Sequence, residues 1–206
     1  MARYQPHDKF FHKARAQGLP SRAAFKLEEL IKRFKLVRAG DRVADLGCAP
    51  GGWLAILAHA AGPSGRVIGV DLARSTITAP NVIVIAGDIR DISIQAAAAE
   101  ALGGHADLIT SDLSPKLSGI AERDQAQSRE LLESALTFAR ATLRPGGAMV
   151  AKVFMGAGFE QVTLIFKRAF ARVELTRAKA TRPGSSELYL IARDHLVTHV
   201  DSSGGA

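Results

Sequence analysis

Asp45-Leu46-Gly47-Cys48-Ala49-Pro50-Gly51-Gly52-Trp53 is the stretch that decides the fold. The apolar residues before it predict a strand, and the amphipathic run over 54–61 predicts a helix after it. Gly47 allows a turn in which a side chain would clash, and Pro50 suits the first turn of a helix. The two later glycines allow a ligand to approach backbone N–H groups that favour an anionic or polar group. The glycine spacing differs from the G-x-G-x-x-G dinucleotide motif.

A second feature typical of ligand binding follows this turn. Val67-Ile68-Gly69-Val70-Asp71 is an apolar strand that ends in an acid, about 20 residues after the glycine turn, where an acid typically holds ribose hydroxyls. Asp45, before the first glycine, is able to face a cation or accept hydrogen bonds from a ligand. The alternative is a strand-to-helix turn without a ligand, and the position of Asp71 counts against it.

Strands alternate with helices along the chain, which predicts an α/β fold with a mostly parallel, seven-stranded sheet and helices on both faces. A short link between the last two strands predicts an antiparallel hairpin at one edge. Expected strands are 43–46, 66–72, 82–88, 106–113, 148–154, 171–175 and 187–192, and expected helices are 22–34, 53–61, 94–102, 124–143 and 159–170. Residues 144–147, Arg-Pro-Gly-Gly, should stop the long helix. We expect a basic helical segment at 1–38 packed on the domain, the α/β domain at 39–194 and a polar tail at 195–206.

Acidic residues occur at or near the ends of four expected strands. They are Asp45, Asp71, Asp88 and Asp112. A single acid at such a place is usually a turn former, but ligands of open α/β sheets bind beyond the carboxyl ends of the strands. Four acids at one edge of the sheet therefore favour a binding site there.

Length and composition indicate one soluble domain with a substantial core. The chain has 206 residues, of which 47% are hydrophobic and 23% are charged. No apolar run approaches the roughly 18 residues that span a membrane, and the N-terminus has no apolar signal core, so we expect a cytoplasmic protein. A single cysteine, Cys48, excludes an intramolecular disulfide. Its two interpretations are a nucleophile and, favoured here because no base partner is evident, a small residue filling a tight turn.

The net charge of +7 is concentrated at the N-terminus. Residues 1–38 contain ten basic and three acidic residues, whereas the rest of the chain is neutral overall. A second basic cluster consists of Lys167, Arg168, Arg172, Arg177, Lys179 and Arg182. Clustered Lys and Arg are typical of binding to a phosphate backbone, although a solvated basic face is an equally simple explanation.

Together, these features resemble the Rossmann-like S-adenosylmethionine-dependent methyltransferases. Four segments narrow the resemblance to the FtsJ-like ribose 2′-O-methyltransferases, specifically the ribosomal RNA large subunit methyltransferase E group. They are 21–27 (SRAAFKL), 45–53 (DLGCAPGGW), 111–115 (SDLSP), and 150–154 (VAKVF) with 186–189 (SELY). The match extends from about Lys9 to Arg193. Cys48 stands where many bacterial members have alanine, and the serine- and lysine-rich leader of some members is missing.

The resemblance implies a site and a reaction. The family's K-D-K-E catalytic tetrad corresponds to Lys26, Asp112, Lys152 and Glu187, and its cofactor contacts correspond to Gly51, Trp53, Asp71, Asp88 and Asp112. We add Asp45 and Gly47 to the cofactor site from their place in the turn, and expect no metal. The implied reaction is 2′-O-methylation of large-subunit ribosomal RNA by S-adenosylmethionine, at a uridine in the peptidyl transferase centre of the 50S subunit. The expected enzyme is a monomer without membrane contact.

Lys152 is the best candidate for a general base that removes the proton of the ribose hydroxyl. Burial and Lys26 would lower its pKa, whereas Asp112 and Glu187 would raise it, so the balance is open from the sequence. We expect the two acids to orient Lys152 and the hydroxyl, and Lys26 to position the target nucleotide. Three rival functions remain: a tRNA ribose methyltransferase, a ribosome-assembly factor that binds RNA without turnover, and a nicotinamide-dependent oxidoreductase. The intact tetrad counts against the second, and the missing G-x-G-x-x-G motif counts against the third.

Overall fold

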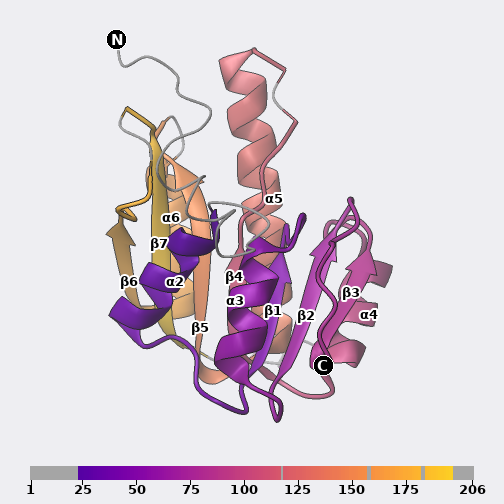
Figure 1. Ribbon diagram of the computed structural model, residues 1–206. Helices are drawn as coiled ribbons and strands as arrows, with labels where there is room; N and C mark the ends of the chain where they lie inside the picture. Colours follow the sequence, from indigo (N-terminus) through magenta and orange to yellow (C-terminus); the bar gives the residue numbers. More distant parts are fainter. Residues whose placement is uncertain (1–22, 117, 157–158, 182–183, 197–206) are drawn as a thin grey trace, which may run out of the picture.

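A computed structural model describes residues 23–116, 118–156, 159–181 and 184–196. Within these ranges the chain forms a three-layer structure, with one sheet between two layers of helices (Figure 1). None of the helices described there is long and apolar enough to cross a membrane. Most of the basic N-terminal segment lies outside the described residues, and so does the tail after Leu196.

The sheet has seven strands in the order β3-β2-β1-β4-β5-β7-β6. Within the described residues, β7 is antiparallel to both its neighbours, and the other six strands run in one direction. The strands are β1 (Arg42–Leu46), β2 (Arg66–Asp71), β3 (Val82–Ala86), β4 (Ala106–Ser111), β5 (Leu143–Phe154), β6 (Phe170–Thr176) and β7 (Glu187–His195). The predicted fold class is confirmed. The antiparallel strand, β7, lies between β5 and β6, and β6 forms the edge of the sheet.

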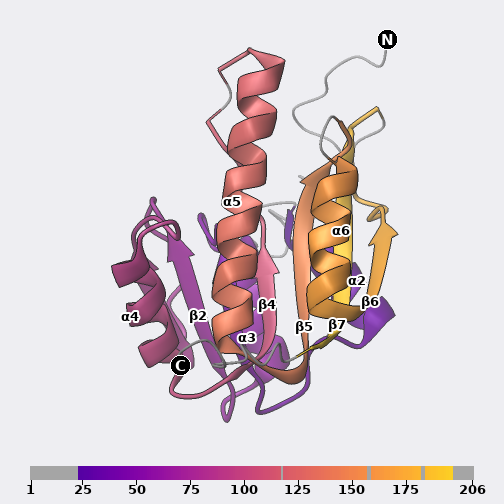
Figure 2. The same cartoon turned by 180° about the vertical axis from the view of Figure 1, so that it is seen from behind.

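Helices cover both faces of the sheet. On the face seen in Figure 1 lie α2 (Ala23–Phe34) and α3 (Gly52–Ala61). Figure 2 shows α4 (Ile92–Leu102), α5 (Ala121–Thr142) and α6 (Phe159–Ala169) on the other face. The first part of α5 extends beyond the sheet, on the side where the parallel strands end. It therefore forms a wall beside the carboxyl ends of those strands.

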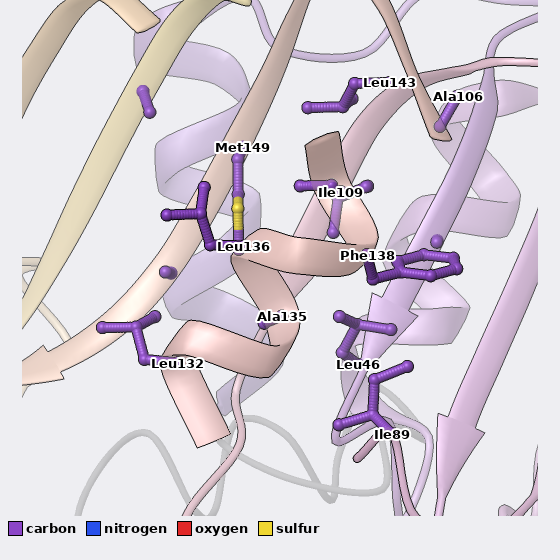
Figure 3. Close-up of a cluster of buried hydrophobic side chains, with 14 of the residues drawn as sticks. Leu46, Ile89, Ala106, Ile109, Leu132, Ala135, Leu136, Phe138, Leu143 and Met149 are labelled. Carbon is purple, nitrogen blue, oxygen red and sulfur yellow. The ribbon is translucent and has the colours of Figure 1, made fainter. Parts of the chain in front are cut away.

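Each face of the sheet has its own apolar core, because alternate residues of a strand point to opposite faces. Figure 3 shows Leu136 and Phe138 of α5 near Leu46, Ile109 and Met149 of the strands. On the other face, apolar residues of α2 and α3 pack on β1, β5 and β7. That second cluster includes Leu27, Leu30, Val43, Leu54, Leu57, Val150 and Tyr189. Truncating one such buried leucine to alanine typically costs about 2–5 kcal/mol of stability.

Three predicted element boundaries are wrong by three residues or more. The segment 144–147 does not simply stop α5, since β5 begins at Leu143 immediately after the helix and includes it. The pairing of β5 with β4 shifts register between Ala106 and Leu108, which accommodates these residues in the strand. The long helix begins at Ala121, three residues earlier than predicted. Finally, β7 continues to His195, the first residue of the predicted tail, which is buried.

Candidate active site

The glycine turn connects β1 to α3, and Gly47 is there for a steric reason. Its φ is +79°, and a Cβ at this position would lie 2.9 Å from the backbone nitrogen of Leu113. Only glycine lets the segment after β4 lie so close to the turn. Gly51, with φ of +118°, precedes the helix, which begins at Gly52. Pro50 therefore lies outside the helix, and the prediction that it occupies the first helical turn is wrong.

A cavity of about 650 Å³ lies beyond the carboxyl ends of β1, β2 and β4. Its walls include five of the residues predicted from the sequence, which are Gly47, Asp71, Asp88, Asp112 and Lys152. Ala49, Leu72, Gly87 and Leu113 also contribute to it. We call it the donor cavity, because the resemblance implies that the methyl donor binds there. It occupies the place at which open α/β sheets bind ligands.

Asp71 connects the end of β2 to the glycine turn. Its Oδ2 accepts a hydrogen bond from the backbone N–H of Ala49 at 2.9 Å, and its Oδ1 accepts one from Ala73 at 2.8 Å. Asp88, after β3, forms an ion pair with Arg90 at 2.6 Å. The hydrogen bonds from Arg90 hold the pKa of the Asp88 carboxyl below its ordinary value. Both carboxylates line the donor cavity, at the ends of neighbouring strands.

Three residues predicted for cofactor binding do not line this cavity. Gly51 lies against Ile77 and Ser75, where its missing side chain makes room. Trp53 is buried, donates from Nε1 to the carbonyl of Ala23 at 2.9 Å, and so connects α3 to α2.

Asp45, the third of these residues, is fully buried. Its Oδ1 accepts a hydrogen bond from the Thr110 hydroxyl at 2.7 Å, and its Oδ2 has no hydrogen-bond partner. Burial raises the pKa of Asp45 to about 8, against the effect of the Thr110 hydrogen bond. A large part of this group is therefore a neutral acid at pH 7, which suits its apolar surroundings.

Lys152 and Asp112 form an ion pair on the wall of the donor cavity. Lys152 projects from β5, and its Nζ lies 2.8 Å from Asp112 Oδ1. The same ammonium group donates to the Asp112 carbonyl at 3.0 Å and to the Ser114 hydroxyl at 2.5 Å. Burial raises the pKa of the Asp112 carboxyl, although the positive charges of Lys152 and Lys26 oppose the shift. The lysine amine thus has one acceptor for each of its three N–H groups.

Lys26 and Glu187 form a second ion pair. Lys26 projects from α2, and its Nζ lies 2.6 Å from Glu187 Oε1 at the start of β7. The Tyr189 hydroxyl donates to the same oxygen at 3.0 Å. Burial alone would raise the pKa of Glu187, but the hydrogen bonds and charge of Lys26 outweigh it and lower that pKa. Burial also raises the pKa of Tyr189, so its phenol stays a neutral donor.

Strand pairing brings these two ion pairs to the same end of the sheet. Lys152 pairs with Tyr189 across β5 and β7, and Phe154 pairs with Glu187 two residues further on. The predicted tetrad residues come from four separate segments and gather here. Sequence reasoning did not assign roles to Ser114 and Tyr189, although both lie inside motifs that it singled out. It also expected Glu187 to orient Lys152, whereas Glu187 contacts Lys26.

Cys48 is buried against the sheet. A Cβ at Gly69 of β2 would lie 2.8 Å from its sulfur, so the thiol fills the space above that glycine. Burial raises the pKa of the thiol to about 12, which keeps it protonated and unreactive at neutral pH. These contacts support the interpretation of Cys48 as a small packing residue.

The second basic cluster does not form one patch. Lys167 and Arg168 lie in the last turn of α6, before β6 begins. Arg177 and Lys179 follow β6, at its carboxyl end, and Arg172 forms an ion pair with Asp194. Lys152 lies near the carboxyl end of β5, and β6 runs parallel to β5. Only the carboxyl end of β6 therefore lies at the same end of the sheet as Lys152. Arg182 lies outside the described residues.

The strand order, the glycine turn and the acids at the strand ends define a Rossmann-like methyltransferase. The chain belongs to the FtsJ-like methyltransferase family, whose model matches residues 19–195. It is similar to the ribosomal RNA large subunit methyltransferase E of Myxococcus xanthus, with 46% identity over 91% of this chain and 89% of that protein. A similar protein of the same name from Methanothrix thermoacetophila is 41% identical over 98% of this chain and 78% of that protein.

Solved structures agree with this assignment. A Plasmodium falciparum structure assigned as a ribosomal RNA methyltransferase has a TM-score of 0.74 and 27% identity, covering 85% of this chain and 98% of that one. Fibrillarin of Aeropyrum pernix, solved with S-adenosylmethionine, has a TM-score of 0.52 and 19% identity, covering 76% and 68%. The second likeness is one of fold alone. As a member of its family, the chain is a methyltransferase that uses S-adenosylmethionine.

Proposed function

We propose that the protein methylates the ribose 2′-hydroxyl of a uridine in the peptidyl transferase centre of large-subunit ribosomal RNA. It acts on the 50S subunit, as a cytoplasmic monomer, with Lys152 as the general base. The observation that carries the proposal is the Lys152–Asp112 ion pair on the wall of the donor cavity. The names of the similar proteins support the choice of ribosomal RNA over tRNA and over binding without turnover.

The residues of the donor cavity fit S-adenosylmethionine. Asp71 and Asp88 offer carboxylate oxygens at the ends of neighbouring strands, and such acceptors match the hydroxyl and amino donors of a nucleoside. The backbone at Gly47 supplies a wall without a side chain. Bound there, the cofactor supplies a methyl group on a positively charged sulfur, which is already activated for displacement.

The chain's own contribution is to hold the hydroxyl and take its proton. The Nζ of Lys152 accepts that proton as a neutral amine, after one of its own protons has passed to water, and the vacated position takes the proton of the hydroxyl. Asp112 and Ser114 keep the amine in place through its remaining N–H groups. Lys26 forms an ion pair with Glu187, whose lowered pKa keeps it a carboxylate. The Lys26 side chain attracts the negatively charged RNA.

Loss of one methyl group from cellular RNA tests this proposal. In a strain lacking the gene, mapping of 2′-O-methyl groups in total RNA should show a single loss, in large-subunit ribosomal RNA. The wild-type gene should restore it, and Lys152→Ala should reduce methyl transfer by at least about 100-fold, as expected when a general base is removed.

The matched control is Lys167→Ala, which removes an exposed lysine in the last turn of α6, far from Lys152. It should restore methylation, and Lys152→Ala should still bind S-adenosylmethionine in calorimetry. Normal turnover by Lys152→Ala would refute its role as the base. A methyl group lost from tRNA instead would show that the substrate is tRNA and that the proposed ribosomal RNA substrate is wrong.

A further inference from the structure

A second cavity, of about 430 Å³, adjoins the donor cavity. It lies between the first half of α5, the end of β5 and the start of α6. Leu113, Leu131 and Lys152 line both cavities, so Lys152 lies where they meet. The mechanism proposed above uses the donor cavity and Lys152 and leaves this second space without a role. We call it the α5–α6 cavity.

The walls of the α5–α6 cavity are largely apolar. Leu132, Val153 and Val162 are buried and form its inner surface. Phe154 and Met155 also line it, and they are 41% and 58% exposed. The Lys152 amine lies 5.7 Å from the centre of the Phe154 ring. An aromatic ring, a flexible thioether and the reacting amine are therefore neighbours.

The polar side chains at the cavity include two amides. Gln125 of α5 and Gln161 of α6 both line it. A Cβ at Gly156 would lie 3.0 Å from Gln125 Nε2, so the glycine lets this amide lie against the backbone after β5. Arg129 and Glu122 also contribute, and they carry opposite charges.

We propose that the α5–α6 cavity binds the base of the nucleotide that is methylated. RNA-modifying proteins recognise unstacked bases by stacking on aromatic side chains and by hydrogen bonds to the base edges. Phe154 and Met155 supply the surface for stacking, and the amides of Gln125 and Gln161 supply donors and acceptors for a base edge. With its base in this cavity, the nucleotide has its ribose beside Lys152 and the donor cavity. The inference rests on the proposed function.

The test compares an intact target nucleotide with one that lacks its base. Large-subunit RNA with a base-free ribose at the methylated position is assembled into subunits and assayed beside the intact substrate. The wild-type enzyme should lose about 10- to 100-fold in kcat/KM on the base-free substrate, mainly through KM, as expected for loss of base stacking. On the intact substrate, Phe154→Ser should have a kcat/KM lower than that of the wild type by a similar factor. On the base-free substrate, the variant and the wild type should have the same kcat/KM.

The matched control is Leu164→Ser, which removes an apolar side chain of similar exposure, 51%, from a part of α6 that does not line the cavity. It should leave both values of kcat/KM unchanged. Met155→Ser should behave like Phe154→Ser, and unchanged thermal midpoints show that each variant is folded.

Two results would overturn the inference. One is equal methylation of the base-free and intact substrates by the wild-type enzyme. The other concerns the kcat/KM of Phe154→Ser. Either it equals that of the wild type on the intact substrate, as expected if a partner protein occupied the cavity, or it falls below that of the wild type by the same factor on the base-free substrate as on the intact one. If the wild-type enzyme fails to methylate the intact target at all, the proposed function is wrong instead.

Discussion

Asp71 is the residue on which binding of the methyl donor should depend most. Its carboxylate lines the donor cavity and holds the glycine turn through the Ala49 N–H. We expect Asp71→Asn to weaken S-adenosylmethionine binding by about 10- to 100-fold in calorimetry, because a charged acceptor is lost. Asp91→Asn is the control, since Asp91 caps α4, does not line the cavity, and asparagine also caps helices well. Unchanged affinity in Asp71→Asn would remove its role.

Asp45 should make stability depend on pH. Its pKa is about 8 in the folded protein, where burial raises it, and near 3.8 without that burial. The folded protein therefore holds a proton that the unfolded chain releases, so its contribution to stability is complete below pH 4 and declines as the pH rises to about 8. The decline is at most about 1.4 kcal/mol per pH unit.

Asp45→Asn tests this dependence, because asparagine keeps an acceptor for Thr110 and does not titrate. Urea unfolding at several pH values should show a flatter dependence between pH 4 and 8 than in the wild type. Asp91→Asn should keep the wild-type slope, since the pKa of the exposed Asp91 is lowered rather than raised. If Asp45→Asn has the slope of the wild type, Asp45 is already ionised in the folded protein.

The element that joins β1 to α3 depends on Gly47. Alanine there would combine an unfavourable φ with a contact of 2.9 Å to the backbone of Leu113. Gly119 has a similar φ of +84°, yet a Cβ there would meet nothing within 4 Å. Gly119→Ala should therefore report the backbone cost alone, about 1 kcal/mol, and Gly47→Ala should cost about 1–3 kcal/mol more in urea unfolding. Equal losses would mean that the segment after β4 moves aside freely.

Pairing between distant elements explains what sequence reasoning could and could not predict. Asp45, Gly47 and Asp71 lie in local motifs, so the glycine turn and the acids at the strand ends were predictable from spacing. The pairing of Lys26 with Glu187 is not local, because it requires β7 to enter the sheet between β5 and β6. Alternating apolar residues predict a strand but carry no information about its neighbours. For the same reason the sequence did not show that Trp53 faces α2 rather than the cavity.

At the scale of the whole molecule, the uneven charge should govern binding to RNA. The surplus of seven positive charges lies in residues 1–38, of which 1–22 lie outside the described residues. We expect Lys9→Glu with Lys13→Glu to weaken binding to large-subunit RNA and to reduce its salt dependence, because each lost phosphate contact reduces the slope of log K against log salt by about 0.7–0.9.

The control is Lys167→Glu with Arg168→Glu, which makes the same change of charge. These residues lie in the last turn of α6, next to the start of β6. This is the end of the sheet opposite to the one that carries Lys152. This variant should bind RNA with nearly the affinity and salt dependence of the wild type. Equal losses in both variants would show that total charge matters and that the N-terminal segment has no special role.

The position of β7 has a consequence during synthesis of the protein. This strand comes last among those described, yet it lies between two strands made before it and carries Glu187 and Tyr189. A nascent chain that has not yet produced β7 leaves β5 and β6 without their common partner and Lys26 without its carboxylate. We therefore expect the proposed active site to form late in translation, and an unfinished chain released early would carry the glycine turn without the Lys26–Glu187 ion pair.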